Sequence, residues 1–218
     1  MNKKEDLTLA LFSAIAVFLL VTFTNALIGS GTSGDPFQIT NCIDLNQTRD
    51  DLAAFYVLNN NIDCSDTINW NGGFGFEPIS TFTGSFDGKN FTITSLFINR
   101  SGDNNVGLFG IMNGGNISNV SLDDAYIRGN YYVGGLVGYS YNYATVDNAY
   151  FSGQVVGSNH VGGLVGYSKS GTIDNSYATG NVNSTGGDYT GGLVGRNRET
   201  DINNSYANGT VSSPTNYV

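Results

Sequence analysis

A short glycine-rich string recurs along the second half of the chain at an almost constant spacing. It ends at Gly110 as VGLFG, at Gly138 and Gly166 as VGGLVG and at Gly195 as TGGLVG, in steps of 28, 28 and 29 residues. A unit of this size cannot bury its own apolar face, so it must stack on its neighbours to form a core. The period therefore predicts a solenoid.

A second block follows each glycine string. It begins ISN at Ile117, VDN at Val146, IDN at Ile173 and INN at Ile202, and the last three copies add a Tyr and a Gly in step. Each repeat offers three short strand-like pieces separated by Gly, Asn and Ser turns, and none has the length or period of a helix. We predict an all-β parallel β-solenoid of three-strand coils, right-handed by the default for parallel crossovers.

Equivalent residues of stacked coils should form ladders, because neighbouring strands lie about 4.8 Å apart. We expect Leu and Ile/Val to form core rows, Gly to occupy turns or crowded backbone, Asn to form an inward or corner-facing amide ladder, and Tyr to stack on Tyr. The predicted ladder residues are Gly110, Gly138, Gly166, Gly195, Leu108, Leu136, Leu164, Leu193, Asn119, Asn148, Asn175, Asn204, Tyr150, Tyr177 and Tyr206.

The pattern is looser upstream of the repeats. Residues 82–98 alternate like a strand pair around an Asp-Gly turn, and residues 55–65 do the same. Residues 42–55 are the one helical candidate after the leader, with Leu45, Leu52 and Phe55 on one face, and a short helix there would cap the first coil. We expect a linker at 29–35, a cap and degenerate coils at 36–105, and repeats at 106–218 that continue beyond Val218.

The first 28 residues indicate export. Lys3 and Lys4 precede an uncharged, mostly apolar run of 22 residues, 7–28, which fits a cleaved signal peptide or an uncleaved membrane anchor. Either alternative places the body outside the cytoplasm, with membrane contact only through residues 7–28. In that oxidising location Cys42 and Cys64 are expected to form a disulfide, the alternative being two buried free thiols.

The composition of the chain limits the classes of partner that it could bind. Only 12% of residues are charged and the net charge is −9, so the chain lacks the basic footprint that a nucleic acid requires. Eight Asn-X-Ser/Thr sequons could accept glycans if the source organism glycosylates exported proteins. They are Asn46, Asn90, Asn99, Asn116, Asn119, Asn183, Asn203 and Asn208.

No catalytic or metal-binding residues are expected, and no cofactor. His160 is the only histidine, and its repeat equivalents Asn105, Tyr132 and Tyr189 differ in type, so we expect it to be exposed and non-catalytic. A zinc peptidase would need more ligands than two Cys and one His supply. Calcium remains an alternative at residues 59–66 or 87–90, against ordinary solvated Asx turns.

A glycan-cleaving β-helix is the rival enzymatic interpretation. It requires two carboxylates at a defined separation, one with a raised pKa. The candidates are Glu77, Glu199 and the repeat-equivalent pair Asp147 and Asp174, and a solvated repeat ladder does not supply the required asymmetry.

Tyrosines are denser around the second glycine string than the repeat requires. They could form a stacking platform for sugar rings or a protein contact, or they could simply pack between coils with their hydroxyls in water. The candidate ligand-contact residues are Tyr131, Tyr132, Tyr139, Tyr141 and Tyr143.

The blocks VGGLVG and IDNSYATGNV resemble the GLUG motif repeats of bacterial and archaeal surface proteins, some of them adhesin-like and some flanking immunoglobulin-A-cleaving peptidases. The resemblance covers about Pro36 to Val218. It departs at the first copy, where VGLFG lacks one Gly and ISNVSLDDAYI lacks the Tyr and Gly of the later blocks. It implies a non-enzymatic secreted or cell-surface β-solenoid, an adhesin-like spacer that could bind a surface glycan or protein. The alternatives are a glycan-active β-helix or the accessory region of a larger secreted peptidase.

The fold assignment has a direct spectroscopic test. Circular dichroism of residues 36–218 should show a β-sheet spectrum, because every segment of the repeat is strand or turn. A spectrum dominated by helix or coil would defeat the prediction.

Overall fold

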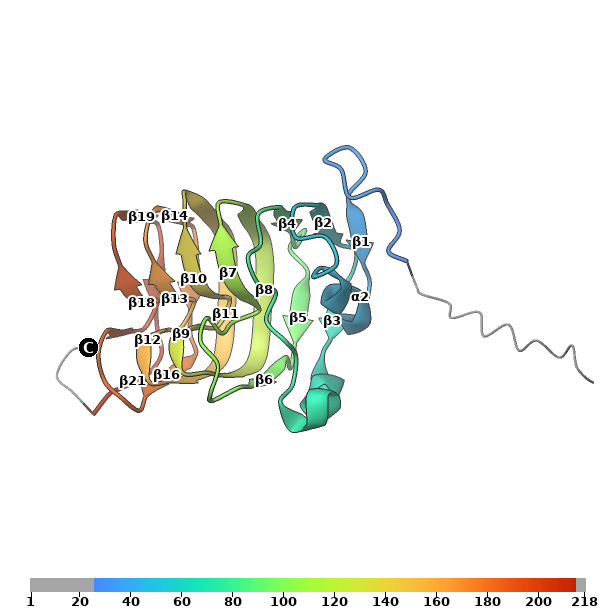
Figure 1. The fold of residues 1–218 in the computed structure, drawn as a ribbon. Coiled ribbons are helices and arrows are strands. Elements are labelled where there is room, and N and C mark those ends of the chain that lie inside the picture. The colour runs from blue at the N-terminus through green and yellow to red at the C-terminus, as the bar shows by residue number, and fades with distance from the viewer. Residues whose placement is uncertain (1–25, 215–218) are drawn as a thin grey trace, which may run out of the picture.

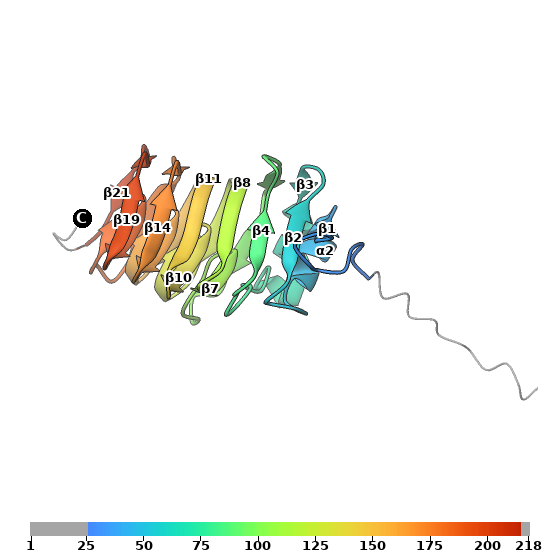
Figure 2. The same cartoon turned by 90° about the horizontal axis from the view of Figure 1, so that it is seen from above.

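The computed structural model describes residues 26–214. The chain winds into a parallel β-solenoid whose coils stack along one axis, from the segment around β1 at one end to β19 and β21 at the other (Figure 1). Seen from above, β2, β4, β8, β11, β14 and β19 lie side by side in chain order across one face (Figure 2). Each strand therefore pairs with its equivalents one coil before and one coil after, as the repeat predicts.

The largest sheet has three tracks that run along the stack. The first holds β1 (Phe37–Ile39), β2 (Phe55–Leu58), β4 (Ser85–Asp87), the start of β8 (Asn116–Arg128), the start of β11 (Ala144–Gly157), β14 (Gly171–Asp174) and β19 (Thr200–Asn203). The second holds β3 (Ile62–Asp63), β5 (Thr92–Thr94), the middle of β8 and β11, β15 (Tyr177–Ala178) and β20 (Tyr206–Ala207). The third holds β6 (Phe97–Asn99), the ends of β8 and β11, β16 (Asn181–Ser184) and β21 (Val211–Ser212).

Two smaller sheets complete the coils of the repeat region. One contains β9 (Tyr131–Gly134), β12 (Asn159–Gly162) and β17 (Thr190–Gly191), and the other contains β7 (Phe109–Asn113), β10 (Val137–Tyr141), β13 (Val165–Ser168) and β18 (Val194–Asn197). A coil such as β14 to β18 thus has five short strands, so the expected three was wrong. The difference arises because each VGGLVG block bends between its second Gly and Leu and supplies two strands, a bend that apolar periodicity does not reveal.

Apolar columns fill the interior. In the first track Tyr56, Phe86, Ile117, Val146 and Ile173 lie opposite one another in successive coils, each at most 2% exposed. The leucines of the glycine strings form another column, in which Leu108, Leu136 and Leu164 are fully buried and Leu193 of the last coil is partly buried.

The N-terminal end carries the only two helical elements among residues 26–214. Helix α2 (Cys42–Gln47) begins where the Asn41 side chain accepts hydrogen bonds from the backbone N–H groups of Ile43 and Asp44, both at 2.9 Å, and the 3₁₀ segment η1 (Ser65–Gly73) follows β3. Leu45, on the inner face of α2, is buried as predicted. The helix ends before Leu52, however, and Phe55 already belongs to β2. No helix in the described part of the chain is long and apolar enough to cross a membrane. The predicted leader lies, up to residue 25, outside the described residues.

The predicted disulfide is confirmed. Cys42 at the start of α2 is bonded to Cys64 directly after β3, with Cα atoms 5.3 Å apart. On the loop-entropy estimate a crosslink of this span stabilises the fold by roughly 3 kcal/mol.

The two upstream hairpins that we expected do not form. Strands β2 and β3, like β4 and β5, follow each other around the coil and pair only with strands of other coils. Lys89 and Asn90 do adopt the positive φ of a tight turn, at 51° and 64°. The turn makes a corner rather than a reversal because Ile93 aligns with Ile62 below and Leu122 above, which buries all three.

The last glycine of each string lies against backbone of the preceding coil. A Cβ on Gly166 would lie 2.5 Å from the Val133 nitrogen and 2.6 Å from the Gly138 oxygen, and one on Gly138 would lie 2.6 Å from the Val106 nitrogen. Backbone cannot move aside as a side chain can. Glycine is thus required at this position so that successive coils can approach.

We therefore expect Gly166→Ala to lower the free energy of unfolding by about 2 kcal/mol, because overpacking against fixed backbone is strained. Urea denaturation followed by circular dichroism measures this change. The matched control is Gly102→Ala, where no atom lies within 4 Å of the added methyl group. Equal midpoints for the two variants would contradict the close-approach argument.

Candidate functional site

Each glycine string brings two outward-facing positions together. One immediately precedes the first residue of the string, Val133, Val161 or Thr190, and the other follows its last Gly, seven residues later. The first position is filled in successive coils by Tyr132, His160 and Tyr189, and the second by Tyr139, Tyr167 and Arg196, which lie in register on β10, β13 and β18. We call these six residues the aromatic seam.

The seam is continuous both along and across the stack. Across one coil, the ring centroids of Tyr132 and Tyr139 are 5.7 Å apart and those of His160 and Tyr167 are 5.5 Å apart. Along the stack, His160 lies between Tyr132 at 4.9 Å and Tyr189 at 4.8 Å. The Arg196 guanidinium covers the Tyr189 ring at 4.7 Å, a cation–π contact that closes the seam at its C-terminal end.

His160 is buried, at 8% exposure, so the expectation that it would be exposed was wrong. Variation in type at its position reflects a column in which phenol and imidazole rings stack on each other, and not solvent exposure. Arg196 Nη1 lies 3.3 Å from His160 Nε2, and because arginine only donates, Nε2 accepts. Burial, with the nearby Arg196 charge, lowers the pKa of His160 to about 4. An imidazole with this pKa and an occupied Nε2 is poorly suited to act as a general base.

The structure brings together four of the five predicted tyrosines. Tyr131 contacts Tyr132 at 6.5 Å, and Tyr139 lies 5.1 Å from Tyr141. Because Tyr139 also stacks on Tyr167 at 5.2 Å, the rings cover one another's faces and do not form an open platform. Tyr143 has no ring partner among the described residues and is 81% exposed.

Sequence reasoning missed His160, Tyr167, Tyr189 and Arg196 as members of the same cluster. A signal was present, since the two seam positions are seven residues apart around both VGGLVG strings and around TGGLVG. The local density of tyrosines indicates a cluster within one coil, whereas the aromatic seam extends over three coils.

The asparagine and tyrosine ladders occupy a different corner. Asn119, Asn148, Asn175 and Asn204 have φ between 48° and 52°, which an Asn tolerates in a left-handed turn. Only Asn148 donates to another ladder member, Asn119, at 2.9 Å, whereas Asn175 and Asn204 donate to aspartates of the preceding coil. The amide ladder is therefore corner-facing and mostly Asn–Asp. The tyrosine ladder stacks as expected, with Tyr150–Tyr177 at 4.6 Å and Tyr177–Tyr206 at 5.1 Å.

The carboxylates do not converge on one site. Asp147 and Asp174 lie one coil apart and accept the amide hydrogen bonds just described. Glu77 pairs with Arg49 at 3.1 Å and Glu199 with Arg198 at 3.6 Å, and the two glutamates line different pockets. Over residues 26–214, no three His, Cys, Asp or Glu side chains are grouped so that they could hold a metal ion.

The sequons differ in accessibility. Asn90, Asn183, Asn203 and Asn208 are exposed, whereas the other four are half-buried. Asn46 accepts a hydrogen bond from Arg49. Glycosylation itself stays a prediction.

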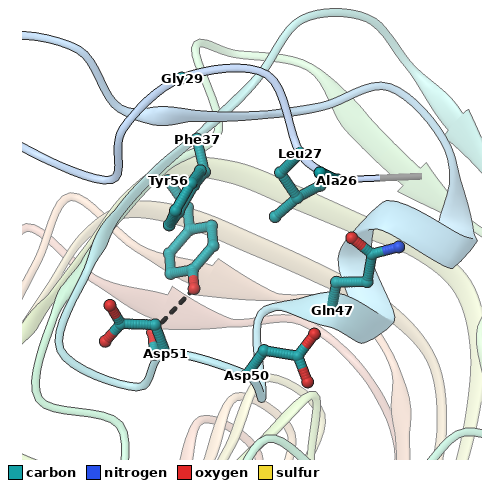
Figure 3. A pocket seen from close by; sticks show the side chains of 8 residues that line it. All are labelled: Ala26, Leu27, Gly29, Phe37, Gln47, Asp50, Asp51 and Tyr56. Atoms are coloured by element: carbon teal, nitrogen blue, oxygen red, sulfur yellow. Dashed lines mark hydrogen bonds between the residues drawn. The ribbon is translucent and has the colours of Figure 1, made fainter. Parts of the chain in front are cut away.

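A pocket of about 350 Å³ lies at the N-terminal end, between the Ala26–Gly29 segment, α2 and the first coils (Figure 3). Phe37 and Tyr56 form its apolar wall, with ring centroids 5.5 Å apart, and Asp50 and Asp51 lie on the other side. The Tyr56 hydroxyl donates to the Asp51 carbonyl at 2.7 Å, and burial with the two nearby carboxylates raises the pKa of Tyr56. The phenol thus stays protonated and structural.

Comparison with known proteins places these features in context. The family described as the GLUG motif matches residues 129–156, 157–183 and 186–212. Halomucin from Haloquadratum walsbyi is 42% identical over 141 residues, which are 60% of this chain and 2% of halomucin. A protein of Evansella cellulosilytica, provisionally named a Gly-rich membrane protein, is 36% identical over 130 residues, 55% of this chain and 15% of that protein. The chain therefore spans a small fraction of both relatives.

A solved structure shares the fold. It is of a provisionally named immunoglobulin A1 protease from Bacteroides ovatus, with a TM-score of 0.69 and 23% identity over 82% of this chain and 58% of that one. At this identity the likeness establishes the β-solenoid architecture alone.

The pKa of His160 predicts a pH-dependent stability. Because that pKa is about 4 in the folded chain and near 6.5 when unfolded, the unfolded state binds more protons between these values. Stability contributed by neutral His160 is complete above pH 6.5 and is lost as the pH falls toward 4, by roughly 2–3 kcal/mol.

The measurement is urea unfolding at pH 7.5 and pH 4.5. His160→Asn supplies the control, because Asn105 fills the equivalent position two coils earlier at φ 57°. Between pH 7.5 and pH 4.5 the parent should lose more unfolding free energy than His160→Asn does. Equal losses in the two proteins would refute the assignment.

Proposed function

We propose that this GLUG-repeat protein is a non-enzymatic, extracytoplasmic β-solenoid that acts as an adhesin-like spacer at a cell surface. The observation that carries the proposal is the repetition in register of exposed columns, the Asn–Asp corner and the Tyr150–Tyr177–Tyr206 ladder. Such a body presents the same kinds of side chain at regular heights. This is a property of a display surface rather than of a single catalytic centre.

Stiffness supports the spacer role. Parallel pairing links every coil to the next, and the glycine strings allow backbone to lie directly on backbone. Six steps separate β1 from β19 along the first track, so at about 4.8 Å per coil they span about 29 Å. Each additional repeat would extend such a rod by the same increment.

Two observations and one prediction from the sequence support an extracytoplasmic location. The Cys42–Cys64 disulfide suits an oxidising compartment. Two relatives carry the names halomucin and Gly-rich membrane protein. The predicted leader of residues 1–28 would direct export.

A second candidate is an accessory region of a larger secreted protein such as a peptidase. The observation that favours it is that the chain spans only 58% of the Bacteroides ovatus protein and smaller fractions of its sequence relatives. A glycan-cleaving role lacks comparable support, because the candidate carboxylates are engaged by amides or arginines.

Export and inertness can be tested together in a bacterial host that produces the full chain. We expect the protein outside the cytoplasm, with Cys42 and Cys64 resistant to thiol alkylation even in denaturant because they are bonded to each other, and no release of reducing ends from a panel of polysaccharides. A variant that lacks residues 1–28 is the control and should stay inside, with both thiols reactive in denaturant.

Two results would contradict the proposal. One is a full chain that remains cytoplasmic with free thiols. The other is the release of reducing ends that Glu77→Gln or Asp147→Asn abolishes, which would indicate a hydrolase.

A further inference from the structure

The corner between β10 and β11 departs from the repeat. Tyr141 aligns with Asn113, but Thr145 aligns with Asn116, so three residues turn this corner where the preceding coil uses two. The next coil also uses two, because Ser140 aligns with Ser168 and Ala144 with Gly171. One residue is therefore inserted here relative to both neighbouring coils.

The insertion presents a strained and uncovered aromatic ring. Asn142 and Tyr143 have φ values of 59° and 63°, whereas the corresponding corner of the preceding coil is made by Gly114 and Gly115. Tyr132 and Tyr189 also have positive φ, at 58° and 57°, but their rings pack in the aromatic seam. In contrast, 81% of Tyr143 is exposed, so the fold gains little packing from a side chain that is rare at positive φ. Strain that packing does not explain points to a function.

The ring borders a pocket of about 270 Å³ lined by Tyr141, Asn142, Tyr143, Lys169, Ser170 and Glu199. The Tyr143 N–H donates to Ser170 Oγ at 3.4 Å, which links the inserted corner to the next coil. Next to the flat apolar ring the pocket thus offers an amide, a hydroxyl, an ammonium and a carboxylate. A sugar ring has the matching chemistry, with an apolar C–H face and hydroxyls at its edge.

Charge at this corner narrows the sugar class. The chain carries a net charge of −9, yet the Lys169 ammonium makes no ion pair with any acid in residues 26–214, while Arg198 beside it pairs with Glu199. An unpaired cation in a pocket favours an anionic group on the ligand. An acidic peptide is a poorer match because closely spaced carboxylates would meet Glu199 and a single free ammonium.

We propose that this pocket, the Tyr143 corner, binds an acidic saccharide, with a sugar ring against Tyr143 and its carboxylate at Lys169. The inference rests on the proposed adhesin-like function and names its ligand class and contact residues. Because the corner occurs once among the described coils, it would give an otherwise repetitive rod a single adhesive point.

The test measures binding of a hyaluronan hexasaccharide to the purified full chain by calorimetry at low salt. The matched ligand is the same hexasaccharide with its carboxyl groups reduced to alcohols, and hexaglutamate tests the peptide alternative. We expect Tyr143→Gly to weaken binding about tenfold and Lys169→Gln about fivefold. The parent protein should bind the reduced hexasaccharide no more tightly than Lys169→Gln binds the acidic one.

Control variants lie outside the corner. Tyr206→Ala removes another exposed tyrosine and Lys89→Gln another exposed lysine, and both should leave affinity unchanged. Tyr143→Gly should keep the parent's unfolding midpoint, since glycine relieves the positive φ. Lys169→Gln provides an independent test that does not alter the turn.

Three results would overturn the inference: no binding by folded parent protein, equal binding of the acidic and reduced saccharides, or tighter binding of hexaglutamate. None of them bears on export or on the thiol state of the cysteines. Failure of the ligand assignment is therefore distinguishable from failure of the proposed function.

Discussion

Close contact between the backbones of successive coils is the constraint on which the structure depends. At Gly138, Gly166 and Gly195 a Cβ would lie within 2.7 Å of backbone atoms of the preceding coil. The glycine string is thus a packing requirement rather than a flexible segment. It allows the bend that makes two strands out of six residues, and that bend brings the seam positions together.

The interior changes in character along the stack. Near the N-terminal end the core is aromatic, with Phe109 lying 5.0 Å from Phe82 and 5.4 Å from Phe86. Toward the C-terminal end equivalent positions shrink, as where Ala178 aligns with Phe151. Ser140, Ser168 and Thr200 form a buried chain of hydroxyl hydrogen bonds at 2.9 and 2.8 Å. Ser140 meets its counterpart Ser168 one coil away, and Ser168 meets Thr200, which aligns with Gly171. These three hydroxyls are therefore buried with hydrogen-bond partners.

Repetition and function use the same geometry in opposite ways. Where the repeat is regular, rings stack on rings and their faces are consumed by packing, as in the aromatic seam. Where one residue is inserted, as at Tyr143, a ring loses its neighbours and becomes available to a ligand. On the proposal made for the Tyr143 corner, a departure from the period marks a binding site better than the density of aromatic residues does.

Much of the fold could be predicted from the sequence, because the stack obeys one rule that the chain repeats. The alignment of Gly138 with Gly166, the buried Leu136 and Leu164 and the pairing of Cys42 with Cys64 follow from period, polarity and compartment. The upstream region was harder. The Asp-Gly turn at residues 87–88 is locally compatible with a hairpin, and only the burial of Ile93 between Ile62 and Leu122 selects a corner.

The sequence by itself determined that the chain is a stacked β protein and which residues occupy equivalent levels, because these properties depend on periodicity alone. Only the tertiary structure decided how the residues at each level pack and which of them are exposed. The number of strands in a coil, the burial of His160 beside Arg196 and the isolation of Tyr143 depend on where the backbone bends and how closely coils approach. Such distances arise from contacts between residues about 28 positions apart, which local pattern does not encode.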